Sequence, residues 1–272
     1  MPLLEFEGCR QRIRRAKAHR EAIAKLWNEA AQKEDFYTVS VSMNDDGTGC
    51  IALFPSYGRD FTNAIALQLG EMLYQLRATL DSAVYASAIR ESGQNPPPNE
   101  NKWEFPLCQK RCDYLSFDRA PLAQKRRDII ESVQPYNVPK IAPDKLVFNQ
   151  NRALGILNEW ARRDRHRRLH VVGSWASNAN PKIRCPEGTV LSRLRVSGSG
   201  FLEDHDEIAT FRLKGFRPGM KVQANPDVEI EIGVNEIPPP CADNDTLGNR
   251  LLAMLHSTAL VVASIEKSFF TE

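Results

Sequence analysis

The chain has 272 residues, of which 42% are hydrophobic, enough to bury a real core in one large domain or two small ones. The formal net charge of +2 is close to neutral, so overall charge gives no reason to expect nucleic-acid binding. Six scattered cysteines do not suggest a disulfide scaffold. The sequence shows no signal-peptide pattern and no apolar run long enough to cross a bilayer, so we expect a cytoplasmic protein without membrane contact.

The first third of the chain predicts two long helices around a hairpin. Residues 8–33 are rich in Ala, Arg, Lys and Glu and lack proline, which favours a long amphipathic helix. Residues 36–43 alternate in polarity, and "CIALFP" at 50–55 follows a "DDGTG" turn, so together they predict a β-hairpin. Apolar residues then recur at three- and four-residue spacing across residues 59–91, which predicts the second helix.

The middle of the chain predicts loops and two further helices. The stretch "SGQNPPPNEN" at 92–101 is typical of a loop, because consecutive prolines cannot continue a helix. A short extended segment at 102–108 follows, with the sequence "KWEFPLC". Residues 120–133 predict a helix with proline near its start and beyond its end, and residues 144–172 predict another.

The last third changes in character after Gly173. Residues up to about 240 alternate as β-strands do, and residues 246–270 predict a final helix. We therefore predict an α+β fold, with long helices packed together with an antiparallel β-sheet and the C-terminal helix returning to the helical core. We expect one interwoven unit, 1–272, made of four parts: 1–58, 59–172, 173–240 and 241–272.

The stretch "ARRDRHRRLH" at 161–170 is the most unusual in the sequence. In the predicted helix, Asp164 lies four residues after Trp160, on the apolar stripe, and Arg167 continues that stripe. The histidines His166 and His170 fall on the opposite, polar side. Because a lone buried carboxylate is costly, Asp164 needs a cationic or hydrogen-bonding partner.

The helix at 59–91 supplies candidate partners for Asp164. Its residues Tyr74, Arg77 and Asp81 follow one another at spacings of three and four, so they form a polar-aromatic stripe beside the apolar one. We expect Arg77 and Asp81 to meet Asp164 and Arg167 across the two helices. The candidate ligand-binding residues are Tyr74, Arg77, Asp81, Asp164, His166 and Arg167.

Such a network supports three readings. It can be a structural ion-pair lattice that sets how the helices pack. It can bind a phosphate-bearing ligand, with the arginines as forked donors and the basic stretch 10–20 as additional support. It can perform acid–base catalysis, with His166 and Arg77 as candidate catalytic residues. His166 and His170 have the spacing of a metal pair, but the arginines around them repel a dication, so we expect no metal and no cofactor.

Ordered motifs between residues 67 and 170 resemble a family of uncharacterised bacterial proteins. The shared motifs are "LRATLD", which contains Arg77 and Asp81, then "FPLC", then "QPY" at 134–136, and finally "DRHR" at 164–167. The resemblance covers about a hundred residues and implies no established activity. It places Gln134, Pro135 and Tyr136 among the family's motif positions, together with Arg77, Asp81, Asp164, His166 and Arg167.

The helices are also distantly similar to HEPN helical domains, a group that includes ribonucleases of toxin and defence systems. The HEPN active motif places an arginine and a histidine on one helix, with four to six residues between them. Arg77 would be that arginine, but Ser82, Ala83 and Val84 occupy the histidine positions. The resemblance therefore implies RNA cleavage only if His166, on the other helix, takes that role.

We expect from these patterns an intracellular HEPN-like module that binds RNA or a phosphate-bearing ligand through a helix-borne Arg/Asp/His cluster. One alternative is a structural or partner-binding protein with a buried ion network. The other is a ribonuclease or hydrolase that uses His166. The expected partner is RNA or a phosphate-bearing ligand, and assembly into a homo-oligomer is left open.

Overall fold

The structure is a computed structural model that describes residues 2–33, 35–117, 122–138, 149–166, 172–177, 179–197, 200–201, 206–234 and 246–270. For residues 165, 166, 172–175, 177, 200, 201 and 206 it describes the backbone alone. The predicted α+β class is confirmed, with long helices and antiparallel sheets. Where the sequence suggested one unit, the chain groups into a helical unit and a β-rich unit. The helical unit comprises 1–24, 66–170 and 238–272, and the β-rich unit comprises 25–65 and 171–237.

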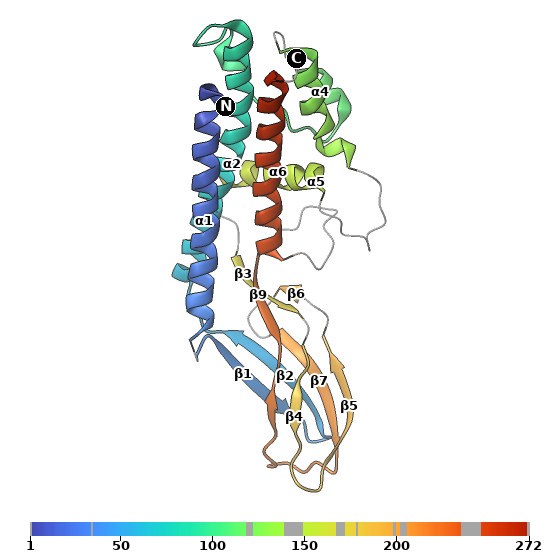
Figure 1. The fold of residues 1–272 in the computed structure, drawn as a ribbon. Coiled ribbons are helices and arrows are strands. Elements are labelled where there is room, and N and C mark those ends of the chain that lie inside the picture. The colour runs from blue at the N-terminus through green and yellow to red at the C-terminus, as the bar shows by residue number, and fades with distance from the viewer. Residues whose placement is uncertain are drawn as a thin grey trace. The chain divides into compact units, whose positions relative to one another are not determined.

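The helices begin and end close to where the sequence places them (Figure 1). They are α1 (Glu7–Ala31), α2 (Arg59–Ser92), α3 (Arg111–Leu115), α4 (Gln124–Ser132), α5 (Gln150–His166) and α6 (Leu247–Lys267). Four short 3₁₀ turns accompany them in the described chain, at Leu4–Phe6, Glu100–Lys102, Pro135–Asn137 and Ser268–Phe270. The short α3 has no counterpart among the predicted elements, because five residues are too few for a periodic pattern to emerge.

In the helical unit, α1 lies beside α2 and α6 (Figure 1). Polar bridges fix these neighbours, as Arg12 donates to Gln75 at 3.2 Å and Arg10 pairs with Glu266 at 3.0 Å. The unit's core is formed by apolar side chains that α2, α5 and α6 direct inward, among them Leu69, Leu73, Leu76, Leu80, Leu154, Leu157, Trp160, Leu251, Met254, Val261 and Ile265. The predicted return of the C-terminal helix to the helical core is confirmed by its packing against α4 and α5.

The predicted helix at 144–172 is too long at its C-terminal end. Strand β3 begins at Val172 and pairs with β9 from Val172 opposite Val234 to Ser177 opposite Glu229. β-branched valine suits an extended pairing better than a helix end, so the sheet contact decides the conformation at this position. Residues 144–148 and 167–171 lie outside the described residues.

The β-rich unit consists of antiparallel strand pairs. A four-stranded sheet has the order β1-β2-β7-β5, a three-stranded sheet has the order β6-β3-β9, and β4 pairs with β8. The strands are β1 (Tyr37–Met43), β2 (Thr48–Pro55), β3 (Val172–Ser177), β4 (Lys182–Arg184), β5 (Val190–Val196), β6 (Gly200–Phe201), β7 (Asp206–Lys214), β8 (Gln223–Asn225) and β9 (Glu229–Val234). The predicted hairpin is confirmed as β1 and β2, joined by the turn that contains Gly47.

The core of this unit lies on one face of the four-stranded sheet. Ile51, Leu53, Phe211 and Leu213 point into it from β2 and β7 and are almost fully buried. Residues of the other strands cover them, including Ala176, Ile183, Ala224 and Ile230. Because strand side chains alternate between faces, the intervening residues of β7 and β5 point to the opposite face, which is exposed to solvent.

One described helix, Leu247–Phe270, has the length and hydropathy of a membrane span. Half of its most apolar window is buried against the rest of the protein, a property shared by the core helices of soluble proteins. Length and composition alone are weak grounds for assigning a membrane segment.

Candidate functional site

Arg77 and Asp81 form the ion pair that the sequence predicts, and both act on the backbone of Phe105. The Arg77 and Asp81 side chains pair at 2.9 Å, and the Arg77 side chain is only 13% exposed. Arg77 donates to the Phe105 carbonyl at 2.7 Å, while Asp81 accepts from the Phe105 N–H at 2.9 Å. The two side chains thus bind both polar groups of one residue, and their described contacts are internal to the fold.

Gln134, which also lies in one of the sequence motifs, hydrogen-bonds to the residues that follow Phe105. Its fully buried amide donates to the carbonyls of Pro106 and Ile130 at 2.8 Å and accepts from the Cys108 N–H at 3.0 Å. Asn158 of α5 donates to the Leu107 carbonyl at 3.2 Å. The segment Phe105–Cys108 belongs to no helix or strand. Side chains from other elements therefore satisfy its backbone N–H and C=O groups, which regular secondary structure would otherwise pair.

Asp164 brings α5 against α2 at Gly70. Its carboxylate oxygens lie 2.8 and 2.9 Å from the position that a Cβ at Gly70 would occupy, so only glycine allows this approach. The predicted contact between the two helices is therefore present. Gly70 precedes Arg77 by seven residues, which is about 10 Å along the helix axis, so Asp164 contacts α2 two turns away from the Arg77–Asp81 pair.

The remaining candidates are only partly placed by the structure. Tyr74 lies on α2 with its side chain 55% exposed. His166 is described by its backbone alone, at the end of α5, and Arg167 lies outside the described residues. The predicted meeting of Arg77, Asp81, Asp164 and Arg167 is therefore confirmed for its first pair only.

Two arginines of α5, Arg162 and Arg163, share one carboxylate. Glu159 accepts from Arg162 at 3.0 Å and from Arg163 at 2.7 Å. These hydrogen bonds, with that of Arg162 the stronger influence, lower the pKa of Glu159. The basic stretch of α1 is similar, since Arg10 and Arg14 both bind Glu7 and lower the pKa of that carboxyl. Much of the positive charge on these two helices is thus matched by acids of the same helix.

A set of cations that the sequence analysis missed lies on the β-rich unit. Arg193 and Arg195 of β5 and Arg212 and Lys214 of β7 point to the solvent-exposed face of the four-stranded sheet, which we call the cationic face. Arg193 is directly opposite Arg212, and Arg195 is opposite Thr210. None of the four forms an ion pair with a carboxylate in the described part of the chain. The alternating stretches "RLR" at 193–195 and "RLK" at 212–214 indicate that cations lie on one face of each strand. The sequence does not indicate that these two strands pair.

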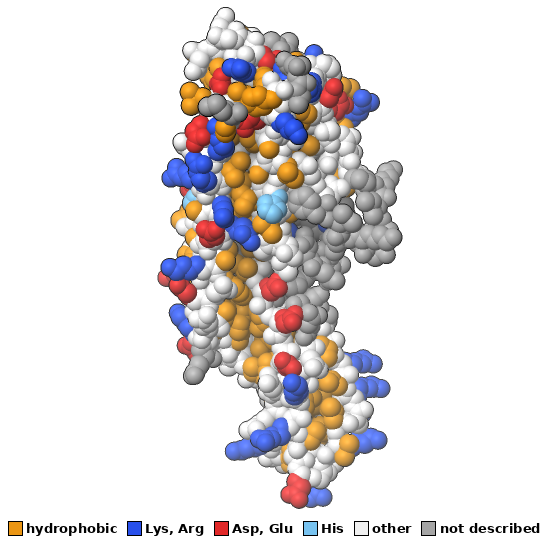
Figure 2. Space-filling view, viewed as in Figure 1, with side chains coloured by type: hydrophobic (Ala, Val, Ile, Leu, Met, Phe, Trp, Pro, Cys, Tyr) orange, Lys and Arg blue, Asp and Glu red, His pale blue; other side chains and the backbone are white. Residues whose placement is uncertain are grey.

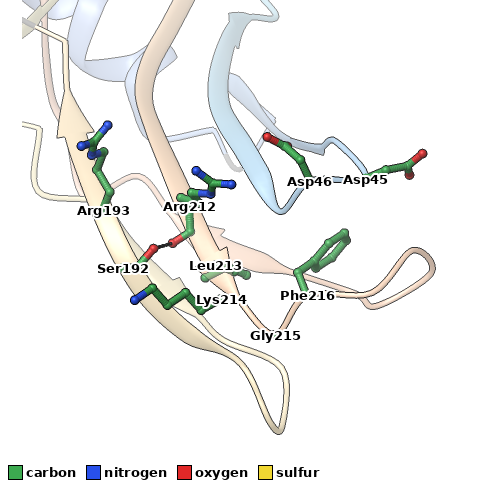
Figure 3. A pocket seen from close by; sticks show the side chains of 9 residues that line it. All are labelled: Asp45, Asp46, Ser192, Arg193, Arg212, Leu213, Lys214, Gly215 and Phe216. Atoms are coloured by element: carbon green, nitrogen blue, oxygen red, sulfur yellow. Dashed lines mark hydrogen bonds between the residues drawn. The ribbon is translucent and has the colours of Figure 1, made fainter.

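The cationic face ends in a shallow hollow of about 480 Å³ (Figure 3). Arg193, Arg212 and Lys214 line one side, and Asp45 and Asp46 of the β1–β2 turn line the other. Asp46 is held by Thr48, whose hydroxyl and N–H donate to it at 2.6 and 3.0 Å. These bonds, with the charge of Arg212 as a smaller contribution, lower the pKa of Asp46. The hollow therefore has a cationic side and an anionic side.

No group of three or more His, Cys, Asp and Glu side chains suited to a metal ion occurs among the described residues. Comparison with known protein families, curated proteins and solved structures gives no match. The resemblances inferred from the sequence motifs therefore stay predictions, and the function is inferred from the side chains themselves.

Proposed function

We propose that the protein binds RNA or another phosphate-bearing ligand, and that the cationic face of the β-rich unit is the binding surface. The observation that carries this proposal is the direct pairing of Arg193 with Arg212 across two strands, with no described carboxylate in ion-pair distance. Side chains opposite each other in a sheet lie about 5 Å apart at Cβ, and like charges there destabilise the sheet. A bound phosphate between the guanidinium groups removes that repulsion.

The rest of the face supports a phosphate ligand. Hydroxyl-bearing residues stand beside the cations, since Thr210 lies opposite Arg195 and Thr48 lies opposite Arg212. Arginine, lysine, serine and threonine supply most contacts to nucleic-acid phosphates. In Figure 2, Lys and Arg side chains project from the side of the β-rich unit where Figure 1 places β5. The aromatic side chain that lines the hollow, Phe216, lies on the side of Asp45 and Asp46 and not with the cations (Figure 3), so we expect binding to phosphates with little dependence on base sequence.

This proposal moves the ligand from the helices to the sheet. The described contacts of Arg77 and Asp81 support a structural role, and Arg162 and Arg163 of α5 are matched by Glu159. Ribonuclease or hydrolase activity through His166 remains the alternative derived from the sequence motifs, and the binding experiment below also scores cleavage.

The test is the binding of a labelled 20-nucleotide single-stranded RNA, measured by fluorescence anisotropy in EDTA at several salt concentrations. Four phosphate contacts predict a slope of about −3 in a plot of log K against log salt concentration. The variant Arg193→Ala/Arg212→Ala should bind at least about tenfold more weakly, and its slope should fall by about 1.4. Gel analysis of the same samples reports any cleavage.

The matched control is Arg14→Ala/Arg162→Ala, which removes two exposed arginines from the helices and changes the net charge by the same amount. We expect the control to keep the affinity of the parent protein. Loss of binding in the control alone would assign the ligand-binding site to the helices and not to the cationic face. Absence of salt-dependent binding by the parent protein would reject the proposed function, and cleavage in EDTA would favour the nuclease alternative.

A further inference from the structure

Strand β5 is an exposed edge of the four-stranded sheet. The strand order β1-β2-β7-β5 leaves one side of β5 without a neighbour among the described strands. All seven of its residues, Val190–Val196, are exposed. Natural sheets usually protect such edges with charges, bulges or covering segments, because the unpaired N–H and C=O groups can accept another strand. β5 itself carries two arginines and a register shift between Leu191 and Arg193, so the regular part of its unpaired edge, residues 193–196, is the part that offers hydrogen-bonding groups to another strand.

The core of the β-rich unit is incompletely covered along this edge. Leu194 lies opposite the buried Phe211 and so points to the core side of the sheet, yet its side chain is 37% exposed. Leu191, opposite the buried Leu213, is exposed to the same extent, and Val196 is 43% exposed. Figure 2 shows hydrophobic side chains at the surface of this unit, beside the projecting Lys and Arg side chains. A further strand along residues 193–196 would cover Leu194 and Val196, whereas Leu191 lies beyond the register shift.

The side chains on the outer face of β5 determine which charge an added strand should carry. Arg193 and Arg195 point away from the core and have no described carboxylate in ion-pair distance. Acidic residues opposite arginines stabilise a strand pair, whereas like charges destabilise it. A second copy of β5 would bring the arginines of both chains together, so the charges disfavour self-pairing. They favour a strand with acidic side chains on the outer face and apolar side chains on the core face.

We propose that β5 binds an extended segment of an acidic partner protein, in which carboxylate and apolar side chains alternate, as an added strand of the sheet. Main-chain hydrogen bonds to the edge would supply affinity, and the alternation would supply specificity. RNA would interact with the arginines of this edge but not with its apolar side chains. RNA has no apolar face for Leu194 and Val196, so the edge fits a polypeptide, which would compete for Arg193 and Arg195 with the RNA of the proposed function.

The test uses a fluorescein-labelled nonapeptide with the sequence EVEVEVEVE and the full-length protein. A peptide of the same composition, with its five glutamates in one block and its four valines in another, is the charge-matched control. We expect the alternating peptide to bind at least about tenfold more tightly than the block peptide, because only alternation places both residue types on their proper faces. Equal binding of the two peptides would reduce the interaction to charge attraction and overturn the proposal.

Matched substitutions on the two edges of the sheet locate the binding. Leu194 of β5 and Val39 of β1, the opposite edge strand, are each 37% exposed. Leu194→Lys should weaken binding of the alternating peptide by about tenfold or more, because it places a charge where apolar contact is needed. Val39→Lys adds the same charge at the other edge and should leave affinity within about twofold of the parent protein. Both variants are checked for an unchanged Tm, and equal affinities would overturn the proposal.

Hydrogen exchange of the β5 amides identifies strand addition directly. The amides that face away from β7 should exchange rapidly in the free protein and at least about tenfold more slowly with the alternating peptide bound. Unchanged exchange at saturating peptide, or no binding of the peptide, would overturn the proposal. Protection of the same amides by single-stranded RNA, which the proposed function places on the cationic face, would assign the edge to RNA and also overturn it.

Discussion

Gly70 shows how a single missing side chain determines the approach of two helices. Glycine inside a helix ordinarily costs about 1 kcal/mol relative to alanine. Here the Asp164 carboxylate occupies the space of a Cβ at Gly70, with oxygen atoms 2.8 and 2.9 Å from that position. A Cβ at this point would force the Asp164 carboxylate, and with it the contact between α5 and α2, to shift.

Gly70→Ala should lower the free energy of unfolding by about 1 to 3 kcal/mol, because overpacking outweighs the better helix propensity of alanine. Gly8→Ala is the control, since no atom lies within 4 Å of a Cβ at that position of α1, and it should be neutral or slightly stabilising. Urea denaturation measures both. The double variant Gly70→Ala/Asp164→Ala should recover part of the loss, and a stabilised Gly70→Ala single variant would contradict the close approach.

Cys9 provides a pH-dependent contribution to stability. Its thiol is buried on α1, and burial raises the pKa of Cys9 from 9.0 to about 11. The unfolded chain releases this proton first, so unfolding becomes easier as the pH rises between these two values. The stabilisation is complete below pH 9 and is lost as the pH approaches 11.

Between pH 8.5 and 10.5, the parent protein should lose roughly 2 kcal/mol more stability than Cys9→Ala. Urea unfolding of both proteins at the two pH values measures this difference, and other titrating groups cancel between them. Equal losses would show that the thiol titrates in the same range in the folded and unfolded chains. At pH 8, thiol reagents should label the exposed Cys112 quickly and Cys9 only on unfolding.

At the scale of the element, charged side chains of one helix hold a segment that has no regular structure. Arg77 and Asp81 of α2 bind both polar groups of Phe105, and Gln134 binds Pro106 and Cys108. Arg77, Asp81 and Gln134 lie in the motifs that the sequence analysis singles out. Their described contacts are hydrogen bonds to buried backbone groups, which need such partners. This structural need explains the motifs without invoking a ligand.

Asp81→Ala should cost about 2 to 3 kcal/mol of stability, because it leaves the Phe105 N–H and the largely buried Arg77 without this partner. Glu71→Ala, an exposed position on the same helix, should change stability by less than about 0.5 kcal/mol. RNA affinity should be the same in both variants and in the parent protein. A loss of RNA affinity in Asp81→Ala, with the fold intact, would instead support the helix-borne ligand site.

The elements differ in how far the sequence predicts them. The apolar period of α2 and α6 and the alternation of β1 and β2 are local patterns, so these elements are predicted to within a few residues. The ion pair of Arg77 with Asp81 is predicted for the same reason, because it spans one helical turn. The helix end near Val172 is predicted wrongly, since pairing with β9, about sixty residues later, determines that conformation.

At the scale of the whole molecule, contacts between distant parts of the chain define both units. The hairpin of β1 and β2 joins the sheet through β7, whose Arg212 lies opposite Thr48. Arg10 near the start of the chain pairs with Glu266 near its end. The cationic face depends on such pairings, because Arg193 and Arg212 become neighbours only when β5 meets β7. Periodicity along the sequence carries no information about which strands pair, so this site was not predicted.

Ending the chain after residue 245 should unfold the helical unit and leave the β-rich unit folded. The deletion removes α6, whose inward side includes buried residues such as Leu251, Met254, Val261 and Ile265. Each large buried apolar side chain contributes about 1.5 to 3 kcal/mol, so their sum is comparable to the whole stability of a domain. We expect the helical unit to lose its cooperative unfolding transition as a result.

The β-rich unit has its own buried core and should survive this deletion. Hydrogen exchange followed by mass spectrometry should show rapid exchange in α5 and continued protection in β2 and β7 of the shortened chain. Removing residues 271–272 alone is the control and should change neither region. Loss of protection in β2 and β7 together with α5 would mean that the two units fold only as one. The cationic face would then depend on the helices for its formation, even though none of its four side chains lies on them.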